Sequence, residues 1–413
     1  MKKCFAPIPL AALFLFSGCN YFKERTVAAE ELSKTYTRTA TQAGEVTDAF
    51  KTAASDFAVK LFQKTLTKDR KNDLVSPLSA LSCIALVNNG ASGNTRAQIE
   101  DMVGLSAEEL NHSLYAYTSS LYSGENCEVR LANSIWFREN KLNVLPEFLQ
   151  TNADWLGAQA YATPFNGDTV KDINNWCYNQ TKGKIDKIIN TIEPETMMYL
   201  INALDFEAKW AKKYERGDIE NGIFHGYNGT DKDVKMLYSE QSEYISDEYA
   251  VGFTRPYEGK KYSFVALLPN EDVDVYEYAK SLTGKGWQTL WETQEYREIH
   301  ARIPEFTYEV EFSLKSALQA LGVTDMFSEN ANFSNIGNTN TSLPLYCEDV
   351  KQKTMIELDR NGTKAAAITW AGMGAMSAAP AEKVYITLDR PFIYAIVDRT
   401  HTLPLFFGLV DTL

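Results

Sequence analysis

Residues 357–380 read Glu357-Leu-Asp-Arg-Asn-Gly-Thr-Lys-Ala-Ala-Ala-Ile-Thr-Trp-Ala-Gly-Met-Gly-Ala-Met-Ser-Ala-Ala-Pro380. If this stretch is a β-strand, its period of two gives one face of small side chains and an opposite face that carries the bulk. The small face consists of Thr363, Ala365, Ala367, Thr369 and Ala371, and the bulky face of Lys364, Ala366, Ile368 and Trp370. As a strand, the stretch could slide its small face against packed structure without clashes. A surface helix that the alanine run starts and Gly372 ends fits the local pattern equally well.

A family resemblance favours the strand. The segment Arg360-Asn-Gly-Thr-Lys-Ala-Ala-Ala-Ile-Thr369 resembles the proximal hinge of the serpins, which commonly reads Glu-Xaa-Gly-Thr-Glu-Ala-Ala-Ala-Xaa-Thr. Other serpin-like motifs occur in family order and extend the resemblance over roughly residues 47–413. These motifs are Asn72-Asp-Leu-Val-Ser-Pro-Leu-Ser-Ala-Leu-Ser-Cys-Ile-Ala-Leu86, Asn89-Gly-Ala-Ser-Gly-Asn-Thr-Arg-Ala-Gln-Ile99, Leu200-Ile-Asn-Ala-Leu-Asp-Phe-Glu-Ala-Lys-Trp210, Leu267-Leu-Pro-Asn270, Ile303-Pro-Glu-Phe306, Leu321-Gly-Val-Thr-Asp-Met-Phe327, Asp389-Arg-Pro-Phe392 and Leu405-Phe-Phe-Gly408. The resemblance implies a single domain over 47–413, in which helices pack on a large mixed central sheet, with smaller sheets and an exposed reactive loop at about 360–382.

Four residues depart from the usual serpin pattern. Arg360 and Lys364 stand where family members usually have glutamates, but both belong to the face that is expected to stay exposed. Gln352 stands where the central sheet often has a histidine, and Ala208 where a glycine precedes Lys-Trp. Of the four, the change at Gln352 bears most on how the sheet opens.

Composition limits the class of protein. The 413 residues are 45% hydrophobic and carry a net charge of −13, which argues against nucleic acid as a partner. No linker rich in proline, glycine or serine follows Gly44, so we expect one large domain and a monomer. Widely spaced histidines and cysteines predict no metal site and no cofactor. Because the core is large, we expect no disulfide framework, and Cys83 in its apolar run should be a buried free thiol.

The N-terminus has the features of a targeting segment. Lys2 and Lys3 precede a short apolar run. The run ends in Leu15-Phe-Ser-Gly-Cys19, which resembles the bacterial lipobox, in which the cysteine is lipidated and becomes the first mature residue. We therefore expect a lipoprotein signal peptide over 1–18, an acylated Cys19 and a polar tether over 19–46. This arrangement predicts a lipid-anchored protein of the bacterial envelope, either periplasmic or surface-exposed. An ordinary signal peptide is the alternative.

Apolar periodicity and capping residues place helices mainly in the first half and strands in the second, which is typical of α+β architecture. Ser76-Pro77 should start a helix that Asn89-Gly90 stops, and Ser106 with Glu109 should form a capping box. Further helices are expected around residues 53–62, over Pro146–Leu156 and over Thr169–Thr181. Strands are expected over Val129–Trp136, Tyr199–Phe206, Ser263–Leu268, Glu298–Glu311, Thr354–Leu358, Val384–Leu388, Ile393–Asp398 and Leu403–Val410.

Enzyme chemistry has no specific support in the sequence. No serine lies in a Gly-x-Ser-x-Gly elbow, and Thr181-Lys-Gly-Lys184 lacks the glycine spacing of a phosphate loop. Gly372-Met-Gly374 is too short for a dinucleotide fingerprint. Acidic residues are plentiful, but nothing singles out the pair that a glycosidase needs. We therefore expect no catalytic residues.

The serpin resemblance implies a mechanism. In inhibitory serpins an exposed loop is bait for a serine protease, and after acylation it inserts into the central sheet and traps the covalently bound enzyme. The family's common spacing of fourteen residues after Gly362 sets the cut bond at Met376-Ser377, with Met373-Gly374 and Ala375-Met376 as alternatives. The unbranched, apolar Met376 suits elastase-like, chymotrypsin-like or subtilisin-like proteases. The resemblance assigns hinge roles to Gly362, Thr363, Ala365, Ala366, Ala367 and Thr369, and sheet-opening roles to Ser76, Ser79, Asn202 and Trp210.

Other interpretations stay open. The four sheet-opening residues also fit ordinary helix capping and core packing. A serpin-fold protein of the envelope that acts as a carrier or chaperone is the alternative function, although such members tend to have bulky or charged hinge residues. The residues Thr363–Ala367 are permissive here, so we predict a suicide-type inhibitor of serine proteases. An envelope enzyme or glycan binder is a third class, and it is disfavoured by the missing motifs.

Overall fold

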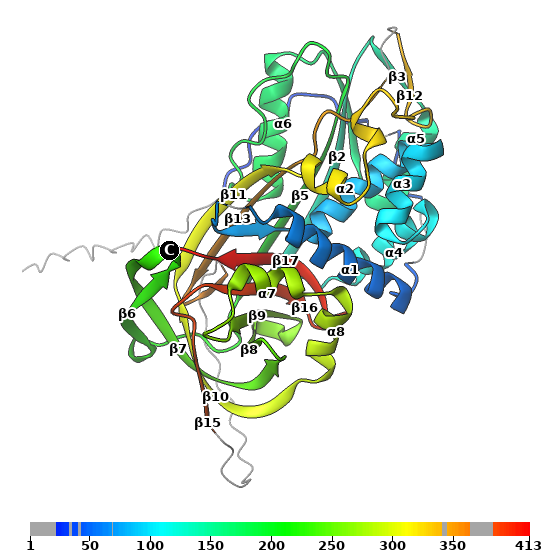
Figure 1. Cartoon of the computed structure of the whole chain (residues 1–413). Coiled ribbons are helices and arrows are strands. Elements are labelled where there is room, and N and C mark those ends of the chain that lie inside the picture. Colours follow the sequence, from blue (N-terminus) through cyan, green and yellow to red (C-terminus); the bar gives the residue numbers. More distant parts are fainter. Residues whose placement is uncertain (1–21, 33–34, 40–42, 68, 341–344, 364–382) are drawn as a thin grey trace, which may run out of the picture.

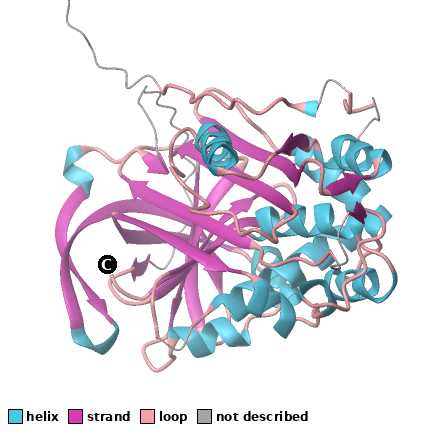
Figure 2. Cartoon of the chain, turned by 90° about the horizontal axis from the view of Figure 1, so that it is seen from above, coloured by secondary structure: helices cyan, strands magenta, loops and turns pink. Residues whose placement is uncertain are grey.

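The computed structural model describes residues 22–32, 35–39, 43–67, 69–340, 345–363 and 383–413. Strands fill one side of this part of the molecule and most helices the other (Figures 1 and 2). The helices are α1 (Asp48–Thr65), α2 (Pro77–Gly90), α3 (Gly93–Val103), α4 (Ala107–Ser120), α5 (Pro146–Leu156), α6 (Gly167–Gln180), α7 (Val275–Ser281), α8 (Gly284–Glu292) and α9 (Lys315–Ala320).

The described strands form two large mixed sheets and a small one. The central sheet has the order β11-β13-β14-β5-β2-β4, with β2 and β4 parallel. The second sheet has the order β1-β17-β16-β9-β8-β7-β10-β15, and β6 pairs with β7 at its side. In the small sheet, β12 pairs with β3. The strand bounds are β1 Asp73–Val75, β2 Cys127–Arg138, β3 Leu142–Val144, β4 Gln159–Thr163, β5 Met198–Lys209, β6 Ile219–Gly226, β7 Thr230–Ser246, β8 Ala250–Pro256, β9 Tyr262–Pro269, β10 Glu295–Pro304, β11 Phe306–Ser313, β12 Gly337–Thr339, β13 Lys351–Asp359, β14 Gly362–Thr363, β15 Lys383–Thr387, β16 Phe392–Asp398 and β17 Leu403–Val410.

Helix α2 lies at the centre of the core. Every residue of α2 except Asn89 is buried, as expected for a helix that is apolar on all sides. It packs against β5 of the central sheet and against β17 of the second sheet. The helix α6 covers the opposite face of the central sheet (Figure 1). Helix α6 contacts β2 and β5, and α2 buries the other face, so side chains that an added strand turned toward α2 would enter a dry environment.

Several local predictions are confirmed. The helix that Ser76 caps ends at Gly90, and Ser106 with Glu109 forms the capping box of α4. Cys83 is buried and has no disulfide partner. The expectation of one strand over Glu298–Glu311 is wrong, because the strand is interrupted at Glu305. Strand β10 then joins the second sheet and β11 the central sheet.

The N-terminal segment differs from a free tether in its described part. Asp172, Asn175 and Asn179 stand at helical spacing on α6 and bond to the backbone of residues 25–29. The carboxylate of Asp172 accepts from the amides of Ala28 and Ala29, both at 2.9 Å. These side chains supply hydrogen-bond partners to an extended backbone segment that is not part of a β-strand. The tether was inferred over 19–46 from polar composition alone, and composition does not show such a docking site.

Candidate functional site

The first two residues of the predicted hinge already form a strand. In β14, Thr363 pairs with Ala208 of β5 on one side and with Leu358 of β13 on the other. Within the described part of the chain, no pairing joins β5 directly to β13, and the short β14 is what connects them. The central sheet thus holds a site for one more strand between β5 and β13, which we call the slot. The hinge occupies one end of the slot, which we call its upper end, and the opposite end is its lower end.

Position 362 requires a glycine. Its φ of 152° is in the region that side chains disfavour. A Cβ atom there would lie 2.2 Å from the carbonyl oxygen of Ala208. Close approach of β14 to β5 therefore requires a glycine.

Thr363 points into a buried aromatic cluster. Thr363 is only 5% exposed, and its hydroxyl oxygen lies 2.8 Å from the hydroxyl oxygen of Tyr257. The Tyr257 ring stacks on Trp210 with 4.6 Å between ring centroids. Burial raises the pKa of Tyr257, so its hydroxyl stays protonated and can bond to Thr363. The hydroxyl pair fixes the point at which the chain enters the sheet.

Arg255 of β8 completes this cluster. Its guanidinium lies 4.8 Å from the ring centroid of Trp210 and 4.0 Å from that of Tyr214. One nitrogen donates to the carbonyl of Lys212 at 2.6 Å. Burial lowers the pKa of Arg255. The stacked cation ties the chain that follows Trp210 to the end of β8.

The turn before β14 is held by side chains. Asp359 accepts from the amides of Asn361 and Gly362, at 2.7 and 3.1 Å. Arg360 forms a two-pronged ion pair with Glu305, with nitrogen–oxygen distances of 3.0 and 3.1 Å. The arginine that departs from the family pattern therefore has an acidic partner at the corner between β10 and β11.

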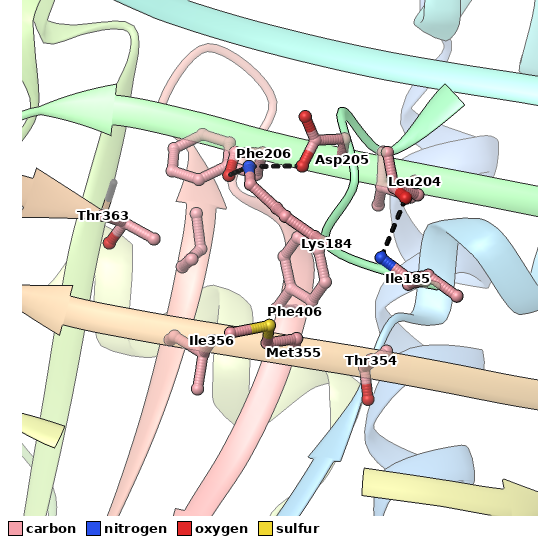
Figure 3. Close-up of a pocket in the computed structure, with 12 residues that line it drawn as sticks. Lys184, Ile185, Leu204, Asp205, Phe206, Thr354, Met355, Ile356, Thr363 and Phe406 are labelled. Carbon is pink, nitrogen blue, oxygen red and sulfur yellow. Dashed lines mark hydrogen bonds and ion pairs between the residues drawn. The ribbon is translucent and has the colours of Figure 1, made fainter. Parts of the chain in front are cut away.

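Two cavities follow the line between β5 and β13. The upper one is lined by Leu204–Phe206, by Thr354–Ile356 and by Thr363 (Figure 3). The lower one has a volume of about 670 Å³ and is lined by Met198–Ile201 of β5 and by Lys351 of β13. Both cavities lie where a strand continued from β14 would run.

A cation lies over the upper cavity. Lys184, in the connection after α6, forms an ion pair with Asp205 of β5 and donates to the carbonyl of Phe206 at 3.3 Å. Burial raises the pKa of Asp205, although Lys184 opposes that shift. The contact anchors the connection across β5 at the level where insertion would begin.

The residues assigned to sheet opening lie in three places: Trp210 beside the hinge, Ser76 with Ser79 at the start of α2, and Asn202 within β5. Ser76 caps α2, and its hydroxyl donates to the carbonyl of Leu405 at 2.9 Å. Gln352 bonds to the backbone of Ser76 in both directions, at 2.9 and 3.0 Å, so it ties β13 to the start of α2. The amide of Ser79 donates to the Ser76 hydroxyl. Asn202 lies apart from them and donates to Asn133 of β2 at 2.8 Å.

A family comparison decides the class of the protein. The model described as Serpin (serine protease inhibitor) matches residues 52–412. The chain belongs to the serpin family. This serpin is 31% identical over 373 residues to leukocyte elastase inhibitor A of Mus musculus, and the match covers 86% of this chain and 97% of the relative.

Solved structures agree with this assignment. The native state of the thermophilic serpin tengpin matches with a TM-score of 0.87 and 38% identity, covering 93% of this chain and 100% of tengpin. The latent state of tengpin matches with a TM-score of 0.81 and 39% identity, covering 90% and 100%. The described fold of this serpin is therefore more similar to the native than to the latent state.

The structure brings Gly362, Thr363 and Trp210 together at one end of the slot. Seven other predicted residues lie outside the described part of the chain: Ala365, Ala366, Ala367, Thr369, Met376, Ser377 and Cys19. Sequence reasoning missed Tyr257, because no local pattern links it to a threonine 106 positions away. Among the described residues, no group of three metal-ligating side chains is placed to hold a metal ion.

Proposed function

We propose that this serpin inhibits serine proteases of apolar primary specificity by a suicide mechanism. The protease cuts the loop at Met376-Ser377, and the chain after Thr363 then inserts between β5 and β13. The observation that carries this proposal is β14, which already pairs with both strands where they lack pairing to each other in the described part.

Continuing the β14 register explains the small face of the hinge. Residue 365 would stand opposite Phe206 and Ile356, and residue 367 opposite Leu204 and Thr354. Alanines at these two positions leave room for the larger neighbours on the buried face of the sheet. The new strand would gain main-chain hydrogen bonds on both edges, which favours insertion once the loop is cut.

Incubation with pancreatic elastase and chymotrypsin tests the proposal. We expect a covalent complex that survives a denaturing gel, and mass spectrometry should find a released fragment that begins at Ser377. Complete cleavage without any complex would refute inhibition. A fragment that begins at Gly374 would keep inhibition but move the bond. Met376→Arg should shift the preference toward trypsin-like enzymes, because the arginine suits their acidic primary pocket.

A carrier function is the second candidate. The cavity of about 670 Å³ at the lower end of the slot favours it, because that volume suits a small ligand. If the cavity is a ligand site, loop cleavage should leave ligand-free thermal stability unchanged. If the slot receives the loop, cleavage should raise the melting temperature sharply.

We also propose that the chain is anchored to a bacterial membrane by acylation of Cys19. The lipobox-like sequence supports this. None of the described helices is long and apolar enough to cross a bilayer. Metabolic labelling with a fatty acid should mark the parent chain and not Cys19→Ala. Labelling of both would contradict the proposal.

A further inference from the structure

The outer face of β7, β10 and β15 carries a ladder of aromatic rings outside the slot. Tyr238 of β7, His300 of β10 and Tyr385 of β15 stack in sequence, with ring centroids 6.0 and 4.8 Å apart. The alternate residues Ile299, Ala301 and Ile386 are buried, so the ladder lies on the outward side of these strands. Figure 1 shows the three strands together at the pole away from α3, α4 and α5.

The outer end of the ladder is open to solvent, whereas Tyr238 and His300 are half-buried. Tyr385 is 67% exposed, and Tyr296, which lines an adjoining hollow, is 82% exposed. These are the two most exposed large hydrophobic side chains in the described part of the chain. The hollow has a volume of about 540 Å³ and is also lined by Glu240 and Glu298. Exposed tyrosines beside a hollow are typical of a protein-binding surface.

Most charges of this face are paired within it, and among those named here Glu240 is the exception. Glu298 contacts His300 at 3.0 Å and Lys383 at 2.8 Å. Arg302 contacts Glu220 at 3.4 Å, and its guanidinium lies 5.4 Å from the ring centroid of Tyr238. Such a surface fits a neutral, amphipathic loop that offers aliphatic or prolyl side chains to the rings. It does not select a strongly charged partner.

Chain length places this face within reach of a protease on the loop. Strand β15 begins at Lys383, six residues after Ser377. Six extended residues span at most about 20 Å. A protease domain of roughly 230 residues has a radius of about 22 Å. An enzyme held at the proposed bond must therefore cover or border the start of β15.

We propose that Tyr385, with Tyr238 and His300, forms a second contact site for the attacking serine protease. The site takes a neutral surface loop beside the enzyme's active-site cleft and speeds the attack on the reactive loop. This inference rests on the proposed function. It adds a contact that acts before acylation and not during insertion.

Variants of the whole chain test the proposal. Tyr385→Ala removes the outermost ring, Tyr385→Phe keeps it, and Tyr249→Ala is the control. Tyr249 is 45% exposed, follows the end of β7, and lines neither the two cavities between β5 and β13 nor the hollow beside the ladder. The readout is the second-order rate of all loop attack by chymotrypsin and by pancreatic elastase, counting covalent complex and cleaved chain together.

We expect Tyr385→Ala to lower this rate about tenfold or more, the loss that an aromatic hot spot gives. Tyr385→Phe and Tyr249→Ala should stay within about twofold of the parent, and the ratio of complex to cleaved chain should not change. An unchanged rate for Tyr385→Ala with both enzymes overturns the contact site, as does an equal loss in Tyr249→Ala. If no variant forms a complex, the proposed inhibition fails, while the cleavage rate still tests the contact.

Discussion

Replacing Thr363 by arginine tests how the hinge enters the sheet. Thr363 is buried between Ala208 and Leu358, and its hydroxyl bonds to Tyr257, so an arginine there has neither room nor an acidic partner among its described contacts. In the intact molecule β14 can withdraw, at the loss of a few hydrogen bonds of about 0.5–1.5 kcal/mol each. In the inserted state the rest of the strand would hold the residue inside. An unpaired buried charge then costs about 3–5 kcal/mol.

This difference should appear in the partition after acylation. A barrier higher by about 3 kcal/mol slows insertion roughly a hundredfold. Deacylation is then faster than insertion. The variant should therefore be cut at a normal rate, but it should be released as a cleaved substrate and leave the protease active. The assay is titration of chymotrypsin, read as molecules of serpin consumed per protease inhibited. We expect this number to rise from near one to at least about ten.

Lys364→Arg is the matched control for the Thr363 variant. The continued register sets residue 364 opposite Glu207 and Glu357, so a cation suits that position and the number consumed should stay near that of the parent. Equal performance of the two neighbouring variants would show that insertion does not use the Thr363 face, and the reasoning would be refuted.

Three further predictions concern the described contacts. Tyr257→Phe leaves the hydroxyl of Thr363 without its buried partner and should lower the free energy of unfolding by about 1–3 kcal/mol in denaturant titration. An unchanged free energy of unfolding would show that the hydroxyl pair does not stabilise the folded state. Burial raises the pKa of Asp411 to about 6, so the folded state binds more protons than the unfolded state between pH 4 and 6, and this group's contribution to stability falls as pH rises through that window. Asp411→Asn should therefore stabilise more at pH 7.5 than at pH 4.5, by up to about 3 kcal/mol, and an equal effect at both pH values would contradict the shift. Asp172→Ala removes two acceptors from the N-terminal segment, so limited proteolysis should cut within residues 25–39 faster than in the parent, and an unchanged rate would show that these bonds do not hold the segment.

Local patterns in the sequence predicted much of the fold. Ser76-Pro77 and Ser106 with Glu109 mark helix starts through contacts three residues away, so a single sequence contains the whole signal. These features depend on neighbours in the chain. For the strand at Gly362 and Thr363, in contrast, the local pattern fitted a helix equally well, and the family resemblance favoured the strand that the structure shows.

Contacts between distant segments were not predictable in the same way. The split between β10 and β11 depends on which sheet each strand joins, and nothing within Glu298–Glu311 except Pro304 indicates a corner. The role of Gln352 became clear only when its bonds to Ser76 were seen across 276 positions. The aromatic ladder brings together residues from three strands, β7, β10 and β15. In the sequence, each of these residues taken singly is indistinguishable from an ordinary surface residue, so the ladder could not be predicted.

Insertion of the cut loop as a strand between β5 and β13 is the central step of the proposed inhibition. Hydrogen exchange of residues 198–207 and 351–357 tests it most directly, measured before and after clean cleavage within the loop. Backbone amides that face the slot should gain a partner, so the account predicts much slower exchange in both segments after cleavage. Exchange that stays the same in both segments after complete cleavage would contradict it.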